Sequence, residues 1–370
     1  MYVIPLPHAY DRYRLIGLIL NYRQAHLPKL SQREFQELTG VHQTQISRLE
    51  SLGKLEEKAR RKRPLNRTHL LAFSVRGLRM SYRDASLLLW LAEGDKFRPW
   101  TAQELRAAEI PKPDPETVRE INFFRKNLRA GWGAVVDLLR KTFARDLLDN
   151  RWGTVNTHML HGNTPTSRRA LYDVLERMEG RPGQRMLVSK YPSILVSTDM
   201  AKSSELVQTV QEPERSELIR RLTERRSTFH MNLEKYGERA IHSVSSLRRF
   251  VSEIFKHNVS AEERKERVRS LIRHLDTYYP KLQVGLADVE PEVEIAIKGT
   301  EFAVVRGTAR DLSNHPETIV CGPSYLFWDE DMTVVTFFLD FEKEWEKLER
   351  KGRTEKKAVI KILEDILSMG

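Results

Sequence analysis

The spacing of apolar residues along the first third of the chain predicts several short helices. Apolar positions recur at the three- and four-residue intervals of a helix that buries one side. Signals such as the capping box of Ser31 and Glu34, the Ser81 cap and the glycines Gly40 and Gly53 set the helix limits, and Val41, Ile46 and Leu49 are expected to face inward. The predicted helices cover 10–25, about eight residues from Ser31 to Gly40, 41–52, 68–75 and 82–93. Together they predict a compact all-α bundle.

Beyond residue 116 the pattern indicates mixed α and β structure. Helical spacing covers 117–148, with a break expected at Gly131 and Gly133, and then 167–179, 212–235, 243–255 and 261–279. Runs rich in β-branched residues predict strands in MLVSKYPSILVS, LQVGLAD, VEIAIKGTEFAVVRG with a Gly299-Thr300 turn, ETIVCG and YLFW. Two final helices are expected at 333–348 and 356–367. The predicted fold class is therefore multidomain, an all-α bundle followed by a larger α+β domain.

Composition narrows the class of protein. Hydrophobic residues make up 40% and charged residues 31% of the 370 positions, as in an ordinary globular protein. No apolar run approaches the roughly 18 residues of a spanning helix, and the N-terminus lacks the features of an export signal. The single Cys321 suits a reducing compartment. We therefore expect a cytoplasmic protein with no membrane partner.

Positive charge is concentrated in the first third of the chain. The net charge is +11, and residues 1–110 hold 19 basic against 11 acidic residues, which leaves 43 against 40 for the remainder. A localised positive field favours binding to a polyanion, because contacts with phosphates release condensed counterions. A solvated surface is the alternative interpretation.

The stretch LSQREFQELTGVHQTQISRLE, residues 30–50, has the spacing of a helix-turn-helix. The second helix of such a pair fits the major groove of DNA, where its exposed residues reach the base edges. Gln bonds adenine, Arg bonds guanine, and Thr offers a methyl group to thymine. The polar positions equipped for this are His42, Gln43, Thr44, Gln45, Ser47 and Arg48.

Residues 31–50 resemble the lambda-repressor-like helix-turn-helix of the XRE family of bacterial and phage regulators. The resemblance rests on Gln32, the turn Leu38-Thr39-Gly40-Val41, the pair Gln43-Thr44 and the closing Ile46-Ser47-Arg48-Leu49-Glu50. It implies that Gln32 and Gln43 brace against phosphate or each other. It also implies DNA contacts by Gln43, Thr44, Ser47 and Arg48. Gln36 departs from the family, which usually has a small residue there, so its side chain must bend outward or open the angle between the helices.

A basic segment follows the predicted recognition helix. It consists of Lys58, Arg60, Arg61, Lys62 and Arg63. We expect it to act as an arm that reaches phosphates or the minor groove, and a solvated loop is the alternative.

The prolines of IPKPDPE predict a linker, because proline restricts the backbone. We therefore expect a helix-turn-helix DNA-binding domain at 1–108, a linker at 109–116 and an α+β sensor and dimerisation domain at 117–370, with a sub-boundary near 180. The stripe Val359, Ile360, Ile362, Leu363, Ile366 and Leu367 is a candidate dimer seam or an ordinary core face.

These patterns favour a one-component transcriptional regulator, a homodimer that binds double-stranded DNA and responds to a small-molecule, peptide or protein effector. No glycine-rich phosphate loop or nucleophile elbow is present, so we expect no enzyme activity and no cofactor or metal. Two other functions stay open. The chain could be a nucleic-acid-processing enzyme targeted by its helix-turn-helix, or a protein-interaction or antitoxin-like module.

Overall fold

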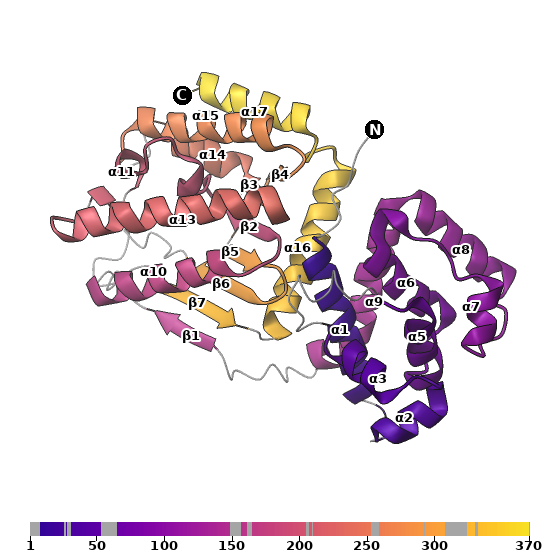
Figure 1. The fold of residues 1–370 in the computed structure, drawn as a ribbon. Helices are drawn as coiled ribbons and strands as arrows, with labels where there is room; N and C mark the ends of the chain where they lie inside the picture. Colours follow the sequence, from indigo (N-terminus) through magenta and orange to yellow (C-terminus); the bar gives the residue numbers. More distant parts are fainter. Residues whose placement is uncertain are drawn as a thin grey trace. The chain divides into compact units, whose positions relative to one another are not determined.

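The computed structural model divides the chain into two compact units, Met1–Trp152 and Gly153–Gly370 (Figure 1). The residues it describes are 8–25, 27, 31–52, 65–148, 157–160, 165–204, 207–208, 210–252, 259–291, 293–307, 324–329 and 332–369. The expected strand ETIVCG lies outside them. Each unit has its own core.

The described part of the first unit is helical. Its elements are α1 (Ala9–Ala25), α2 (Gln32–Thr39), α3 (Gln43–Glu50), α5 (Arg67–Ala72), the π-helical turn η1 (Phe73–Gly77), α6 (Tyr82–Glu93), the 3₁₀ turn η2 (Gly94–Lys96), α7 (Ala102–Ala107), α8 (Pro115–Lys126) and α9 (Leu128–Leu148). The helix α6 is buried along nearly its whole length and packs against α1, α5, α8 and α9. The prediction for 82–93 is confirmed, and the all-α character of this part is as expected.

The proline-rich segment leads into a helix of the first unit. Asp114 caps α8, and Pro115 occupies the first turn, where its missing N–H costs nothing. Because α8 and α9 both pack on α6, the division of the chain falls after Trp152. This differs from the expected linker at 109–116. The break within 117–148 falls at Asn127 and not at Gly131 and Gly133, where it was expected. Gly131 lies inside α9, closely packed against the ring of Trp90.

A mixed seven-stranded sheet forms the centre of the second unit. Its strands are β1 (Thr157–Leu160), β2 (Arg185–Ser189), β3 (Glu238–Ser243), β4 (Leu282–Ala287), β5 (Val293–Lys298), β6 (Phe302–Gly307) and β7 (Ser324–Asp329), in the order β1-β7-β6-β5-β2-β3-β4. The neighbours β2, β3 and β4 are parallel and the other pairs are antiparallel. The unit is therefore α+β, as expected.

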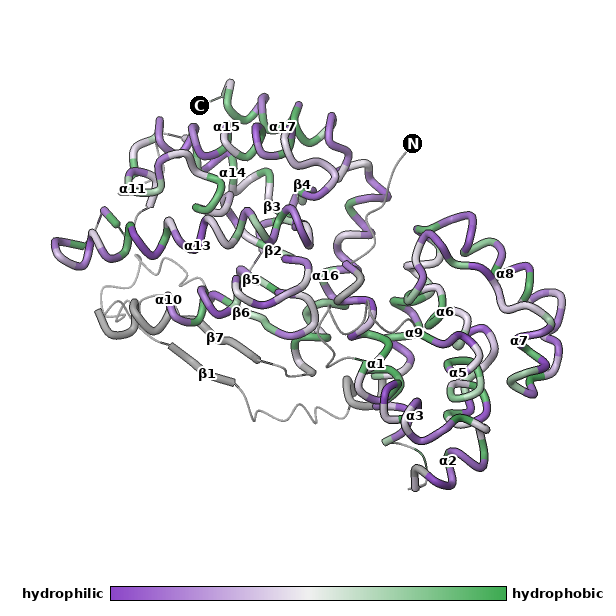
Figure 2. Tube along the Cα trace, viewed as in Figure 1, coloured by the Kyte–Doolittle hydropathy of each residue, from purple (hydrophilic) through white to green (hydrophobic). Residues whose placement is uncertain are grey.

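Helices cover both faces of this sheet. They are α10 (Pro165–Gly180), η4 (Ile194–Val196), α11 (Met200–Ser203), α13 (Glu214–Tyr236), α14 (Val244–Val251), α15 (Ala261–Tyr278), α16 (Met332–Arg350) and α17 (Lys356–Met369). The helix α16 packs on β2 and β4 to β7, while α10, α13 and α15 lie on the other side (Figure 1). Along α13 and α15 hydrophilic and hydrophobic residues alternate as expected for helices with one buried side (Figure 2).

The apolar stripe of α17 belongs to the main core of the second unit. Val359, Leu363 and Ile366 are buried with residues of β3, β4, α14 and α15, and the other three members of the stripe are partly buried against the same cluster. This packing favours the core alternative over the dimer seam. None of the described helices combines the length and the apolar character needed to cross a membrane.

Candidate nucleic-acid interface

Helices α2 and α3 form a tight pair joined by Gly40, Val41 and His42. The side chain of Ser31 accepts a hydrogen bond from the N–H of Glu34, and the Glu34 carboxylate accepts one from the N–H of Ser31, so the predicted capping box is present. Gly40 ends α2 with a φ of 69°, a left-handed conformation that glycine adopts at little cost. The chain thereby reverses direction within three residues.

The second helix begins two residues later than expected, at Gln43. His42 is its cap, because its Nδ1 accepts a hydrogen bond from the N–H of Thr44 at 3.3 Å. Val41 is buried beneath the turn, and Ile46 and Leu49 are buried on the inner side of α3. These three inward positions agree with the sequence-based prediction.

Gln36 connects the two helices directly. Its Oε1 accepts a hydrogen bond from the backbone N–H of Gln43 at 3.3 Å. The first N–H groups of a helix have no partner within the helix, so this bond caps α3 from α2. The long side chain at the position where the XRE family has a small residue is therefore bent toward α3 and is partly buried.

The other end of α3 is attached to α1. The Nδ2 group of Asn21 donates to the carbonyl oxygen of Glu50 at 3.0 Å, and the Nε2 group of Gln24 donates to its carboxylate at 2.8 Å. On the opposite side α2 packs against η1, where the rings of Phe35 and Phe73 lie 5.7 Å apart. Both ends of α3 are therefore held by side chains of other helices.

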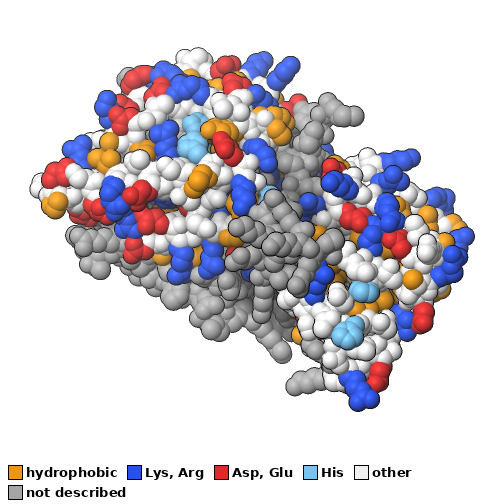
Figure 3. Space-filling model, viewed as in Figure 1, with side chains coloured by type: hydrophobic (Ala, Val, Ile, Leu, Met, Phe, Trp, Pro, Cys, Tyr) orange, Lys and Arg blue, Asp and Glu red, His pale blue; other side chains and the backbone are white. Residues whose placement is uncertain are grey.

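The outward side of α3 carries hydrogen-bonding groups and little charge. His42, Thr44 and Ser47 are exposed, and Gln43, Gln45 and Arg48 are half-buried. The structure thus brings six of the predicted contact residues together on one turn and one helix. In Figure 3 the surface over α3 is mostly uncharged, with few acidic or basic side chains.

Charge near α3 is modest within the described residues. Arg33 of α2 is paired with Glu37 at 3.1 Å, and its side chain is 83% exposed. Arg48 faces His69 of α5, and its positive charge adds to the effect of burial in lowering the pKa of His69. His69 is therefore neutral near pH 7, and positive charge at this surface comes mainly from arginine. The predicted arm, Lys58, Arg60, Arg61, Lys62 and Arg63, lies outside the described residues, as does the side chain of Gln32.

A cluster of arginines in the second unit was not predicted from the sequence. Arg185, Arg225, Arg267 and Arg306 line one cavity, although they lie far apart along the chain. A signal was present in the strand VEIAIK, where Glu294 and Lys298 share one side of a strand that is otherwise apolar. Charges on a buried strand side must be paired, so they indicate a polar cluster. Among the described residues, no group of three or more His, Cys, Asp or Glu is placed to hold a metal ion.

Comparisons with known proteins give little further information. No protein-family model matches the chain, and no curated protein sequence matches it. A solved structure that matches is that of TrmBL2, described as an archaeal chromatin protein with a novel mode of DNA binding. The likeness covers 76% of this chain and 98% of that one, with 11% sequence identity and a TM-score of 0.27. At that score neither fold nor binding mode can be transferred.

Proposed function

We propose that this protein is a sequence-specific DNA-binding regulator of transcription, in which α2 and α3 act as a helix-turn-helix. The observation that carries the proposal is the geometry of α3. Its apolar side is buried, both of its ends are hydrogen-bonded to other helices, and its outer side presents amide, hydroxyl and guanidinium groups. A helix held in this way can enter the major groove with little further ordering. The resemblance of residues 31–50 to XRE regulators supports the same assignment.

The roles of the side chains follow from base chemistry. Gln43 and Gln45 are suited to adenine, which offers an acceptor and a donor to an amide, and Arg48 is suited to guanine. Thr44 and Ser47 can contact phosphate or the thymine methyl group. The segment 58–63 supplies phosphate contacts beside the groove. Specificity then lies in α3, and most of the salt-dependent affinity lies in the basic segment.

The second unit is proposed to bind an effector and to support a homodimer, without catalysing a reaction. A homodimer would place two copies of α3 about 34 Å apart, on a site with two-fold related halves. Because the α17 stripe is covered within its own unit, the dimer would use another surface. An effector acts by favouring one arrangement of the DNA-binding helices over another.

Selection from a random duplex library with purified protein, at roughly physiological salt, tests this function. We expect an inverted repeat to be enriched. Gln43→Ala and Arg48→Ala should each weaken binding to it by about 1–3 kcal/mol and relax the preference at one position. The controls are Gln103→Ala and Arg106→Ala, which remove the same side-chain types from exposed positions of α7 in the same unit.

Two outcomes of the selection experiment would contradict the proposal. If the enriched pool has no common sequence, or if both pairs of variants change binding equally, α3 does not read bases.

A further inference from the structure

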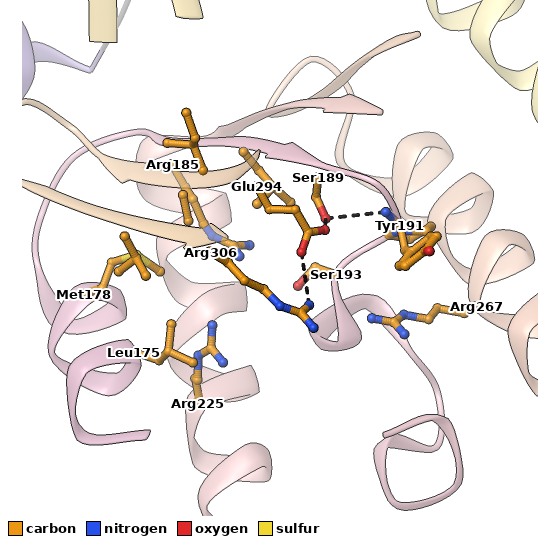
Figure 4. Close-up of a pocket in the computed structure, with 15 residues that line it drawn as sticks. Leu175, Met178, Arg185, Ser189, Tyr191, Ser193, Arg225, Arg267, Glu294 and Arg306 are labelled. Atoms are coloured by element: carbon orange, nitrogen blue, oxygen red, sulfur yellow. Dashed lines mark hydrogen bonds and ion pairs between the residues drawn. The ribbon is translucent and has the colours of Figure 1, made fainter. Parts of the chain in front are cut away.

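A cavity of about 180 Å³ lies on the side of the sheet covered by α10 and α13. It opens at the carboxyl end of β2, where Ser189 leads into Tyr191 and Ser193, and it continues over β5 and β6. The guanidinium groups of Arg225, Arg267 and Arg306 reach it from three different elements, α13, α15 and β6 (Figure 4). An apolar wall completes it, made by Leu175, Met178, Leu187, Ala296 and Val304.

The one carboxylate in the described lining, that of Glu294, already has hydrogen-bond and ion-pair partners within the protein. Glu294 accepts hydrogen bonds from the Ser189 hydroxyl at 2.7 Å, from the N–H of Lys190 at 3.0 Å and from Arg306 Nη1 at 3.0 Å. Only 8% of its surface is exposed. Glu294 therefore fixes the position of Arg306 at the cavity, rather than offering a free negative charge to a ligand.

Strand register explains the charges beneath the cavity. Arg185 of β2 stands opposite Glu238 of β3 on one side and Lys298 of β5 on the other. Arg185 Nη1 is 2.8 Å from the Glu238 carboxylate, and Arg225 Nη2 is 3.3 Å from the Glu179 carboxylate. The buried acids Glu179 and Glu238 thus stand among the buried bases Arg185, Arg225 and Lys298.

Arg267 and Arg306 also line the cavity, and Glu294 is the one carboxylate in the described lining. Among its described residues the lining holds four guanidinium groups and one carboxylate. Such a lining favours an anionic ligand, because guanidinium groups bind carboxylate and phosphate with charge-assisted hydrogen bonds.

We propose that this cavity binds a small amphipathic anion. A carboxylate or phosphate group would lie among Arg225, Arg267 and Arg306, and a short apolar body would pack against Met178 and Val304. Arginine is well suited to planar, two-point contacts with either anion. Pockets for larger ligands usually span roughly 300–1,000 Å³, so this cavity selects a ligand about the size of benzoate.

The claim that the bound anion acts as an effector rests on the proposed regulatory function. The claim that the cavity binds an anion does not rest on it. Binding is therefore measured on the full chain without DNA, by calorimetry with acetate, butyrate, hexanoate, benzoate, phenyl phosphate and inorganic phosphate. Benzamide is the neutral counterpart of benzoate. We expect saturable binding of at least one anion with an apolar body, at least tenfold weaker binding of acetate and inorganic phosphate, and none of benzamide.

Substitutions locate the site. Arg267→Met keeps the contact of a long side chain with the ring of Phe250 but removes the charge, and should weaken anion binding at least tenfold. Arg220→Met on the outer side of α13 is the matched control, since its guanidinium pairs with Glu217 and Glu224 away from the cavity. If Arg267→Met fails to fold, Ala296→Leu, which fills the apolar wall, replaces it with the same expectation.

Three results would overturn the proposal: no saturable binding by any anion of the series, equal binding of benzamide and benzoate, or equal weakening by the cavity and control variants. A DNA-binding assay with and without the tight-binding anion then tests regulation separately. Failure of that assay alone removes the effector role and leaves the anion site standing.

Discussion

The side-chain oxygen of Gln36 on α2 accepts a hydrogen bond from the backbone N–H of Gln43, the first residue of α3. Gln36→Ala should therefore destabilise the first unit by about 0.5–1.5 kcal/mol, the usual net value of one hydrogen bond. Urea unfolding followed by circular dichroism measures the change. Gln36→Glu retains an acceptor and should unfold close to the wild-type midpoint. Equal losses in the two variants would show that this bond contributes nothing.

Close packing behind α2 provides a second prediction, at Gly77. A Cβ atom there would lie 3.0 Å from Thr39 Cγ2 and 3.2 Å from the ring of Phe35, so Gly77→Ala crowds two side chains of α2. We expect a loss of about 1–3 kcal/mol in the free energy of unfolding. Gly133→Ala is the control, because a Cβ at that helical position in α9 meets nothing within 4 Å. It should stabilise the protein by about 0.4–1 kcal/mol.

The basic segment should control the dependence of DNA binding on salt. Because each phosphate contact lowers the slope of log K against log salt by about 0.9, replacing Arg60, Arg61 and Lys62 by alanine should make that slope shallower by up to about 3. The dissociation constant is measured across a salt series on the selected site and on unrelated duplex DNA. Affinity should fall on both in parallel. A loss confined to the selected site would instead assign base contacts to the segment.

His242 makes stability sensitive to acid. Burial is the main cause that lowers the pKa of this side chain to about 4, although its Nδ1–H donates to the carbonyl oxygen of Ser189 at 2.9 Å. The unfolded chain takes up the proton near pH 6.5 and the folded chain does not, so stability present above pH 6.5 is lost as the pH falls toward 4.

The expected loss from His242 over that window is on the order of 3 kcal/mol. Urea unfolding at several pH values measures it, with His242→Asn as the comparison, since asparagine keeps a donor for Ser189 but does not titrate. The variant should be less stable than wild type near pH 7, and the two stability curves should converge as the pH falls toward 4. Parallel curves would mean that His242 does not cause the acid sensitivity.

A buried ion pair joins the sheet to α16. Arg239 Nη1 lies 3.1 Å from Glu342 Oε2, and the guanidinium group also contacts the rings of Phe341 and Trp345, with centroids 5.3 and 5.4 Å away. Glu342→Gln should cost about 3–5 kcal/mol, because it leaves a buried charge without its partner. Arg239→Met and Glu342→Leu made together should cost much less than the sum of the same two substitutions made separately. Additive effects in this double-mutant cycle would refute the coupling.

Local signals account for what the sequence predicted well. The capping box at Ser31, the glycine at position 40 and the inward spacing of Val41, Ile46 and Leu49 all act within one or two helical turns, and the structure has them as expected. The helix at 82–93 and the hairpin at Gly299-Thr300 are confirmed for the same reason.

Features that depend on partners distant in sequence were not predicted. The strand β3, ERAIHS, is rich in polar residues and was missed, because its Glu238, Arg239 and His242 are buried only through partners on β2 and α16. The arginine cavity has the same origin, since its four guanidinium groups come from four elements. The chain divides after Trp152 and not at the proline-rich segment, where the linker was expected. Pro115 lies in the first turn of a helix of the first unit, a position that suits proline as well as a linker does.

The pairing of β1 with β7 has a consequence for synthesis of the chain. The first strand of the second unit finds its partner only after β2 to β6 have been made, whereas β2, β3 and β4 are made in sequence and pair with neighbours already available. A ribosome that stops before β7 leaves the outer edges of β1 and β6 open, and such edges recruit other chains or proteases. The sheet is therefore complete only once the chain has been made as far as β7.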